Sequence, residues 1–92
     1  MHGKMDPDAR LKRLRFRAWH RGVREADLLV GGYFDCHHQA WSEADMDWFE
    51  QLLEEQDVDI MAWAFGTAQP PERFAGEMMS RLQKLNYIKH PQ

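Results

Sequence analysis

The sequence has little of what stabilises secreted proteins or anchors membrane proteins. It has one cysteine, Cys36, among 92 residues, so no internal disulfide can form, which favours a reducing compartment. No apolar run approaches the roughly 20 residues of a membrane-spanning helix. The amino terminus lacks the apolar stretch of a signal peptide. We therefore expect a cytoplasmic protein that does not insert into a membrane.

Strand signals are also scarce, because β-branched residues are few and no stretch of five or more residues alternates apolar and polar side chains. A chain of this size removes only about 60–65% of its unfolded surface on folding, which disfavours a deep active-site cavity. We expect a disordered tail over residues 1–8 and one domain over residues 9–88. We expect no catalytic residues and no self-sufficient enzyme.

Apolar residues at helical spacing predict an all-α fold, a compact bundle of about five short helices. Gly22 is expected to end the first helix and Ser42 to cap the third. The expected helices cover residues 8–20, 23–36 and 43–55, a short fourth segment that Asp57 or Asp59 caps and Gly66 ends, and a segment that begins near Glu72.

Positive and negative side chains are segregated along the chain, behind a formal net charge of -3. Residues 1–24 carry eight basic and two acidic side chains, whereas residues 25–60 carry eleven acids and neither Lys nor Arg. On the first helix, Arg10, Arg13 and Arg17 are expected to lie on a solvated face opposite the apolar stripe. Either the two regions fold together and neutralise each other, or one of them steers a charged partner.

The densest group of charged residues lies where the first two expected helices meet. Gly22 permits a sharp turn there, between the bidentate donor Arg21 and the acceptor Glu25. In a purely local interpretation, Gly22 ends one helix, Glu25 and Asp27 favour the start of the next, and Arg21 pairs with one of these acids. The alternative is a loop that displays its backbone between opposite charges and inserts into a partner protein.

The segment Cys36-His37-His38 invites a metal or redox interpretation, but its spacing is poor. Adjacent residues on a helix point about 100° apart, so these three side chains cannot converge on one ion. No C-x-x-C or H-x-x-x-H pair completes a site. We expect no metal site and no catalysis by Cys36.

The basic first helix is also typical of helices that bind phosphates, which makes a small nucleic-acid-binding regulator an alternative function. Against this interpretation, the acids that follow would oppose binding to phosphates.

Trp19 and Trp63 lie on apolar stripes, whereas Trp48 lies off the stripe of its helix. Trp48 either faces a partner or packs under a neighbouring helix.

The motif Arg21-Gly22-x-x-Glu25-x-Asp27, preceded by an Arg-rich helix and Trp19-His20, resembles the R-G-x-x-E signature of the succinate dehydrogenase flavinylation factors. These small FAD assembly factors of bacteria and mitochondria are also called the succinate dehydrogenase assembly factor 2 family. The resemblance covers roughly residues 11–85, through Phe49-Glu50-x-Leu52-Leu53 and Asp57-x-Asp59-Ile60-x-x-Trp63 to Gly66. The sequence departs from the commonest pattern between Gly31 and His38.

The resemblance implies a helical bundle in the bacterial cytoplasm, a monomer when free, that binds the flavoprotein subunit of succinate dehydrogenase and often that of fumarate reductase. It implies that the factor promotes covalent attachment of FAD to this client without being the catalyst. FAD is then held by the client, and the factor binds none stably. Carried over by position, the expected partner-binding residues are Arg17, Trp19, Arg21, Gly22, Glu25 and Asp27.

Overall fold

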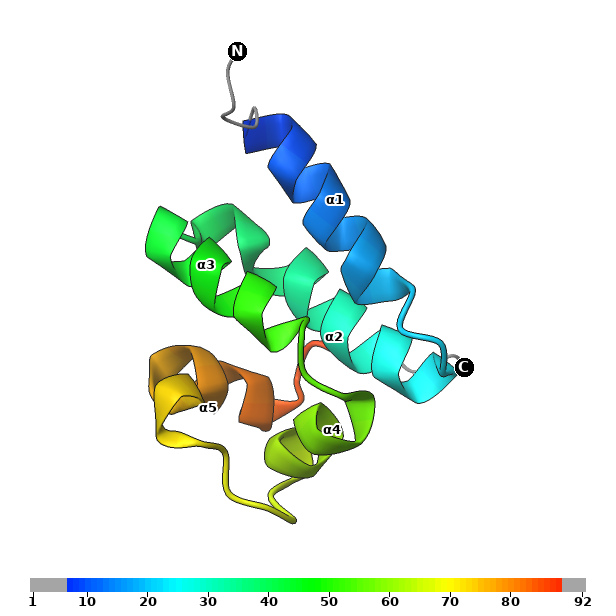
Figure 1. The fold of residues 1–92 in the computed structure, drawn as a ribbon, viewed down its shortest axis with the longest axis vertical. Helices are drawn as coiled ribbons and strands as arrows, with labels where there is room; N and C mark the ends of the chain where they lie inside the picture. The colour runs from blue at the N-terminus through cyan, green and yellow to red at the C-terminus, as the bar shows by residue number, and fades with distance from the viewer. Residues whose placement is uncertain (1–6, 89–92) are drawn as a thin grey trace.

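Five α-helices and two short 3-10 helices make up the fold in a computed structural model that describes residues 7–88. Figure 1 shows α2 in the middle of the bundle, with α1 on one side and α4 and α5 on the other. None of the helices within the described range is long and apolar enough to cross a membrane. The predicted all-α bundle is confirmed. The elements are α1 (Pro7–Trp19), α2 (Arg24–His37), η1 (His38–Ala40), α3 (Glu43–Leu52), α4 (Asp57–Phe65), η2 (Glu72–Phe74) and α5 (Glu77–Lys84).

Local signals set several helix ends. Ser42 caps α3, because its hydroxyl accepts from the Asp45 amide at 3.2 Å and the Asp45 carboxylate accepts from the Ser42 amide at 3.1 Å. Gly66 ends α4 in the left-handed conformation, with φ at 81°. Both predictions are confirmed. The residue that caps α4 is Gln56, so the prediction of Asp57 or Asp59 as the cap is wrong, although α4 does begin at Asp57.

Three other boundaries differ from the prediction. Residues 72–74 form η2 and α5 begins only at Glu77, because Phe74 turns into the core and Gly76 breaks the backbone with φ at 135°. α3 ends at Leu52, three residues early. α1 begins at Pro7, so the last two residues of the predicted tail are helical, and residues 1–6 lie outside the described part.

The core is built around the ring of Tyr33, on the inner face of α2. Its hydroxyl donates to the Met78 carbonyl of α5 at 2.8 Å, and aromatic rings from α3, the segment after η1 and the segment after α5 surround it.

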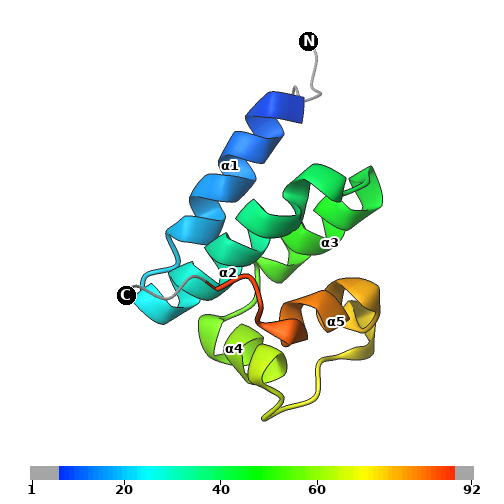
Figure 2. The same cartoon turned by 180° about the vertical axis from the view of Figure 1, so that it is seen from behind.

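Trp48 packs here too, with its Nε1 donating to the Phe74 carbonyl at 3.3 Å and its ring edge-on to Phe74. Of the two alternatives for Trp48, packing under a neighbour is therefore the correct one. Figure 2 shows from behind how the chain after α5 returns to α2.

The basic first helix folds against the acidic middle of the chain. Arg10 donates to Asp47 at 2.6 Å and to Glu50 at 2.9 Å, and Arg17 forms an ion pair with Glu54. The predicted solvated face is therefore wrong for Arg10 and Arg17, which lie against α3 and the residues after it. Mutual neutralisation is the interpretation that the structure bears out. A phosphate-binding first helix is not supported, because these acids occupy the guanidinium groups of Arg10 and Arg17.

Candidate functional site

The loop between α1 and α2, residues 20–23, is called the junction loop below, and it turns at Gly22. This residue has φ at +112°, a conformation that side chains disfavour, whereas a Cβ built on it would meet nothing within 4 Å in the described part of the chain. The requirement for glycine here is thus set by the backbone and not by lack of space. The position immediately after the turn, Val23, is extended and is the N-cap residue of α2.

Arg21 fastens the junction loop to the connection between α3 and α4. Its guanidinium donates through Nε to Asp57 Oδ1 at 2.7 Å, through Nη1 to the Leu53 carbonyl at 2.9 Å, and through Nη2 to the Glu55 carbonyl at 2.7 Å. Only 10% of the Arg21 side chain is exposed. These carbonyls lie where α3 was expected to continue, so the early end of α3 coincides with this contact. Arg21 is therefore a structural tie between segments far apart in the sequence.

The local interpretation of the junction is correct for its acids, because Glu25 and Asp27 lie in the first turn of α2. Arg21 does pair with Asp27, but through its backbone N–H, which donates to Asp27 Oδ1 at 2.6 Å. The side chain goes to Asp57 instead, 36 residues away. Residue 21 is thereby held at its backbone by α2 and at its side chain by α4.

The tip of the junction is exposed, in contrast to the residues that hold it. Gly22, Arg24 and Glu25 are exposed, and Val23 presents 48% of its surface. No ion pair or hydrogen bond of the Glu25 side chain is present within residues 7–88. The motif thus divides into two parts, with Arg21 and Asp27 directed inward and Gly22 and Glu25 available to a partner.

Trp19 and Arg17, the other two expected partner-binding residues, both make contacts within the chain. The Trp19 ring lies on the backbone of Gly31, and its Nε1 is buried with no hydrogen-bond partner in the described part. Arg17 pairs with Glu54, in the same connection that binds Arg21. The structure therefore groups Trp19, Arg21, Gly22, Glu25 and Asp27 at one junction, with Arg17 directed toward the α3–α4 connection.

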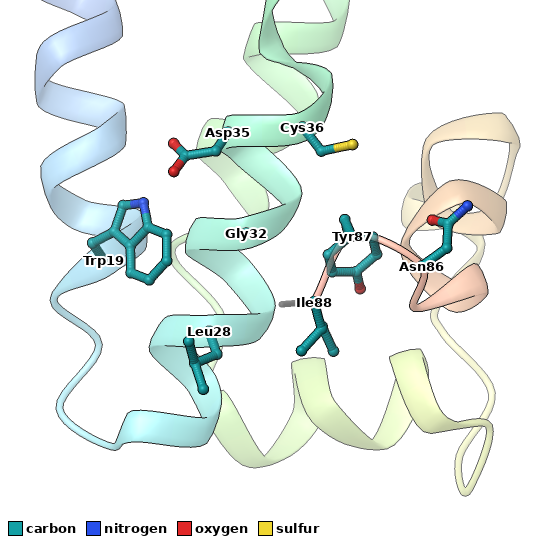
Figure 3. A pocket seen from close by; sticks show the side chains of 8 residues that line it. All are labelled: Trp19, Leu28, Gly32, Asp35, Cys36, Asn86, Tyr87 and Ile88. Carbon is teal, nitrogen blue, oxygen red and sulfur yellow. The ribbon is translucent and has the colours of Figure 1, made fainter. Parts of the chain in front are cut away.

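A groove of about 450 Å³ crosses α2 beside the junction. Figure 3 shows α2 passing between Trp19 of α1 and the Tyr87-Ile88 segment after α5. The double glycine of α2 makes this arrangement possible, since Gly31 lies under Trp19 and Gly32 under the Tyr87 carbonyl. These two glycines are thus sites where other segments approach α2 closely.

A family model described as the flavinator of succinate dehydrogenase matches residues 12–86. The chain belongs to this family. Over 81 residues it is 36% identical to the FAD assembly factor SdhE of Acetobacter pasteurianus, an alignment that covers 88% of this chain and 74% of that protein. The family and the extent of the resemblance, predicted from residues 11–85, are confirmed.

Mitochondrial proteins named succinate dehydrogenase assembly factor 2 are also similar. The protein of Schizosaccharomyces pombe is 31% identical over 78 residues, which cover 84% of this chain and 56% of that protein. The protein of Dictyostelium discoideum is 31% identical over 72 residues, which cover 78% of this chain and 51% of that protein. The chain thus spans about half the length of these two relatives.

Cys36, His37 and His38 do not share one site: Cys36 is exposed, and the two histidines have different neighbours. His38 Nδ1 donates to the Phe34 carbonyl at 2.9 Å and its ring stacks on Phe34, whereas the half-buried His37 ring packs between Tyr33 and Tyr87. Burial lowers the pKa of His37. Within residues 7–88 no group of three or more His, Cys, Asp and Glu is placed to hold a metal ion.

Sequence reasoning missed two features of this region. Asp57 was expected at the start of a helix and within the family resemblance, but not as the carboxylate that bonds Arg21. Phe16 is 61% exposed, and its ring stacks on that of His20 with the two ring centroids 3.9 Å apart. Both rings line a second groove, together with Lys12 and Arg15. A signal for Phe16 was present, because it lies off the apolar stripe of its helix, but none in the local sequence pointed to Asp57.

Proposed function

We propose that this chain binds the flavoprotein subunit of succinate dehydrogenase and promotes the covalent attachment of FAD to that client. The observation that carries the proposal is the division of the junction motif in a flavinator-family chain. Gly22 and Glu25 are displayed to solvent, whereas Arg21 is 10% exposed and bonded from behind. A motif arranged in this way suits binding to another protein's site better than chemistry of its own.

Each part of the junction has a physical role in this proposal. The absence of a side chain at Gly22 lets the client approach the loop backbone closely. Glu25 accepts charge-assisted hydrogen bonds from the client, each of which contributes about 1.5–3 kcal/mol when shielded from water. Val23 adds apolar contact area next to them. Arg21 and Asp27 keep the loop in the conformation that presents these groups.

The chain is proposed to act as a maturation factor and not as the catalyst. FAD stays bound to the client, and the loop holds the client in a conformation in which its own residues complete the attachment. Binding energy from the contact between the two proteins then favours the reactive arrangement of the client. We extend the proposal to the fumarate reductase flavoprotein as a second client, to a free monomer and to the bacterial cytoplasm as the site of action.

Purified components test the proposal directly. The apo flavoprotein subunit is incubated with FAD, with and without the chain, and covalent flavin is measured by fluorescence of the denatured client band. We expect the chain to accelerate the appearance of covalent flavin and the folded Gly22→Arg variant to lose this effect. Equal rates with and without the wild-type chain would overturn the proposed function.

A further inference from the structure

We propose that Asp57 is a positioning residue for the junction loop: it fixes the Arg21 guanidinium and thereby keeps Gly22 and Glu25 in the orientation that a client binds. Its predicted effect on the client rests on the proposed function, whereas its effect on the loop does not. Asp57 begins α4 and lies 36 residues from Arg21 in the sequence, outside the R-G-x-x-E motif.

Of the three acceptors that bond the Arg21 guanidinium, Asp57 is the one that contributes a side chain, so a substitution can remove it. Arg21 has three acceptors, and two of them are backbone carbonyls, of Leu53 and Glu55, which any residue at those positions would supply. The third acceptor is the Asp57 carboxylate, which bonds Nε at 2.7 Å. Its side chain is 23% exposed and that of Arg21 is 10% exposed, so this ion pair is partly shielded from water.

The junction loop has few other restraints on this side. Among the described residues, nothing lies within 4 Å of a Cβ built on Gly22, so none of residues 7–88 packs against the turn at this point. The residues on either side of the turn hold it: Val23, whose carbonyl accepts from the Asp27 amide, and Arg21. The backbone of Arg21 is bonded to Asp27, and its side chain to Asp57 and two carbonyls. Loss of the Asp57 contact therefore removes one of the three bonds that fix the guanidinium and weakens the restraint on the loop.

Arg21 itself is poorly placed to contact a client. Its Nε, Nη1 and Nη2 atoms all donate within the chain, and leaving them would strip a nearly buried cation of its partners. The effect of Arg21 on client binding is therefore exerted through the loop. Glu25 differs from Arg21, because it is exposed and has no such contacts within the described range. Glu25 is therefore expected to contact the client directly, and Arg21 is not.

The first test uses the free chain. In a ¹⁵N-labelled Asp57→Asn variant, whose fold is checked by circular dichroism, we expect the amide resonances of Gly22 and Val23 to shift and that of the core residue Phe49 to stay. Asp59→Asn is the matched control, because Asp59 is exposed on the same helix two residues away. Arg21→Lys should shift the same loop amides as Asp57→Asn. Loop amides that do not move in Asp57→Asn, or that move as much in Asp59→Asn, would overturn the inference.

The second test is a double-mutant cycle in the affinity for the client flavoprotein subunit. Asp57→Asn and Arg21→Lys should each weaken binding about tenfold, and the double variant should bind no more weakly than Arg21→Lys alone. Asp57→Glu, which keeps the charge, should restore part of the affinity. Independent, additive losses would show that Arg21 contacts the client directly and would overturn the inference. If the wild-type chain does not bind the client at all, the proposed function fails, while the resonances of the free chain still decide the role of Asp57.

Discussion

The indole ring of Trp19 lies so close to the backbone of Gly31 that a Cβ at position 31 would come within 2.3 Å of Trp19 Cδ2. Real Cβ atoms do not approach ring carbons this closely, so a side chain at position 31 would force the indole aside. The contact joins the end of α1 to the middle of α2, immediately before the chain enters the junction loop. Gly31 is therefore part of the support of the candidate site.

Gly31→Ala should destabilise the chain by about 1–2 kcal/mol, because overpacking against Trp19 outweighs the gain of about 1 kcal/mol in helix propensity. Thermal unfolding followed by circular dichroism measures the change. Gly32→Ala is the control, because its Cβ would meet the Tyr87 carbonyl oxygen at 3.2 Å, a contact that a small shift relieves. A Gly31→Ala variant more stable than the wild type would contradict this account of the Trp19 contact.

Arg21→Ala should lower the free energy of unfolding by about 3 kcal/mol, because it leaves the partly buried Asp57 carboxylate and two carbonyls without their donor. Arg15→Ala is the matched control. Arg15 pairs with Asp35 at 3.3 Å, but both side chains are exposed, so its loss should cost less than about 1 kcal/mol. Urea unfolding of both variants makes the comparison, and equal losses would refute the structural role of Arg21.

Short-range patterns account for most of what the sequence predicted correctly. The capping residues of α3, the terminal glycine of α4 and the apolar stripe of α1 act through contacts within a few residues, which a sequence displays directly. The R-G-x-x-E motif located the junction for the same reason. The sequence does not show, however, which charged residues of the junction face inward. Arg21 and Arg24 are the same residue type, and they differ only in what folds against them.

Long-range contacts account for what was missed. The partner of Arg21 lies 36 residues away, and no periodicity relates Asp57 to the first junction. The start of α5 was placed too early because the spacing of Phe74 with later apolar residues suits a helix, whereas burial of Phe74 in η2 and the break at Gly76 depend on the assembled core. Tertiary packing here overrides a valid local pattern.

Gly22→Ala should reduce stability by about 1–3 kcal/mol through backbone strain alone, because φ is +112° and none of residues 7–88 comes within 4 Å of the added Cβ. Gly66→Ala is a close control, since Gly66 also has positive φ and no described residue within 4 Å of its Cβ position, but lies at the end of α4. Both variants should unfold at lower temperature, and only Gly22→Ala should also weaken client binding. Equal client affinity for the two variants would show that the conformation of the junction loop does not affect client binding.

His37 should make the fold sensitive to mild acid. Burial lowers its pKa in the folded state below the ordinary value of about 6.5, so between pH 7.5 and 5.5 the unfolded chain binds more protons than the folded one. The free energy of unfolding should therefore fall as the pH is lowered through this window. Urea titrations at both pH values measure it, and His37→Gln should show a smaller difference. A wild-type chain that gains stability at pH 5.5 would contradict this sign.

The central claim is that the exposed tip of the junction loop acts on the client, and Glu25→Ala tests it most directly. Glu25 is exposed and has no partner within residues 7–88, so its removal should change stability by less than about 0.5 kcal/mol. The measurement is the covalent flavin fluorescence of the denatured client band, with Glu72→Ala as an exposed acidic control. The account predicts a marked loss of covalent flavin with Glu25→Ala and none with Glu72→Ala. Unchanged covalent flavin with a folded Glu25→Ala variant would contradict it.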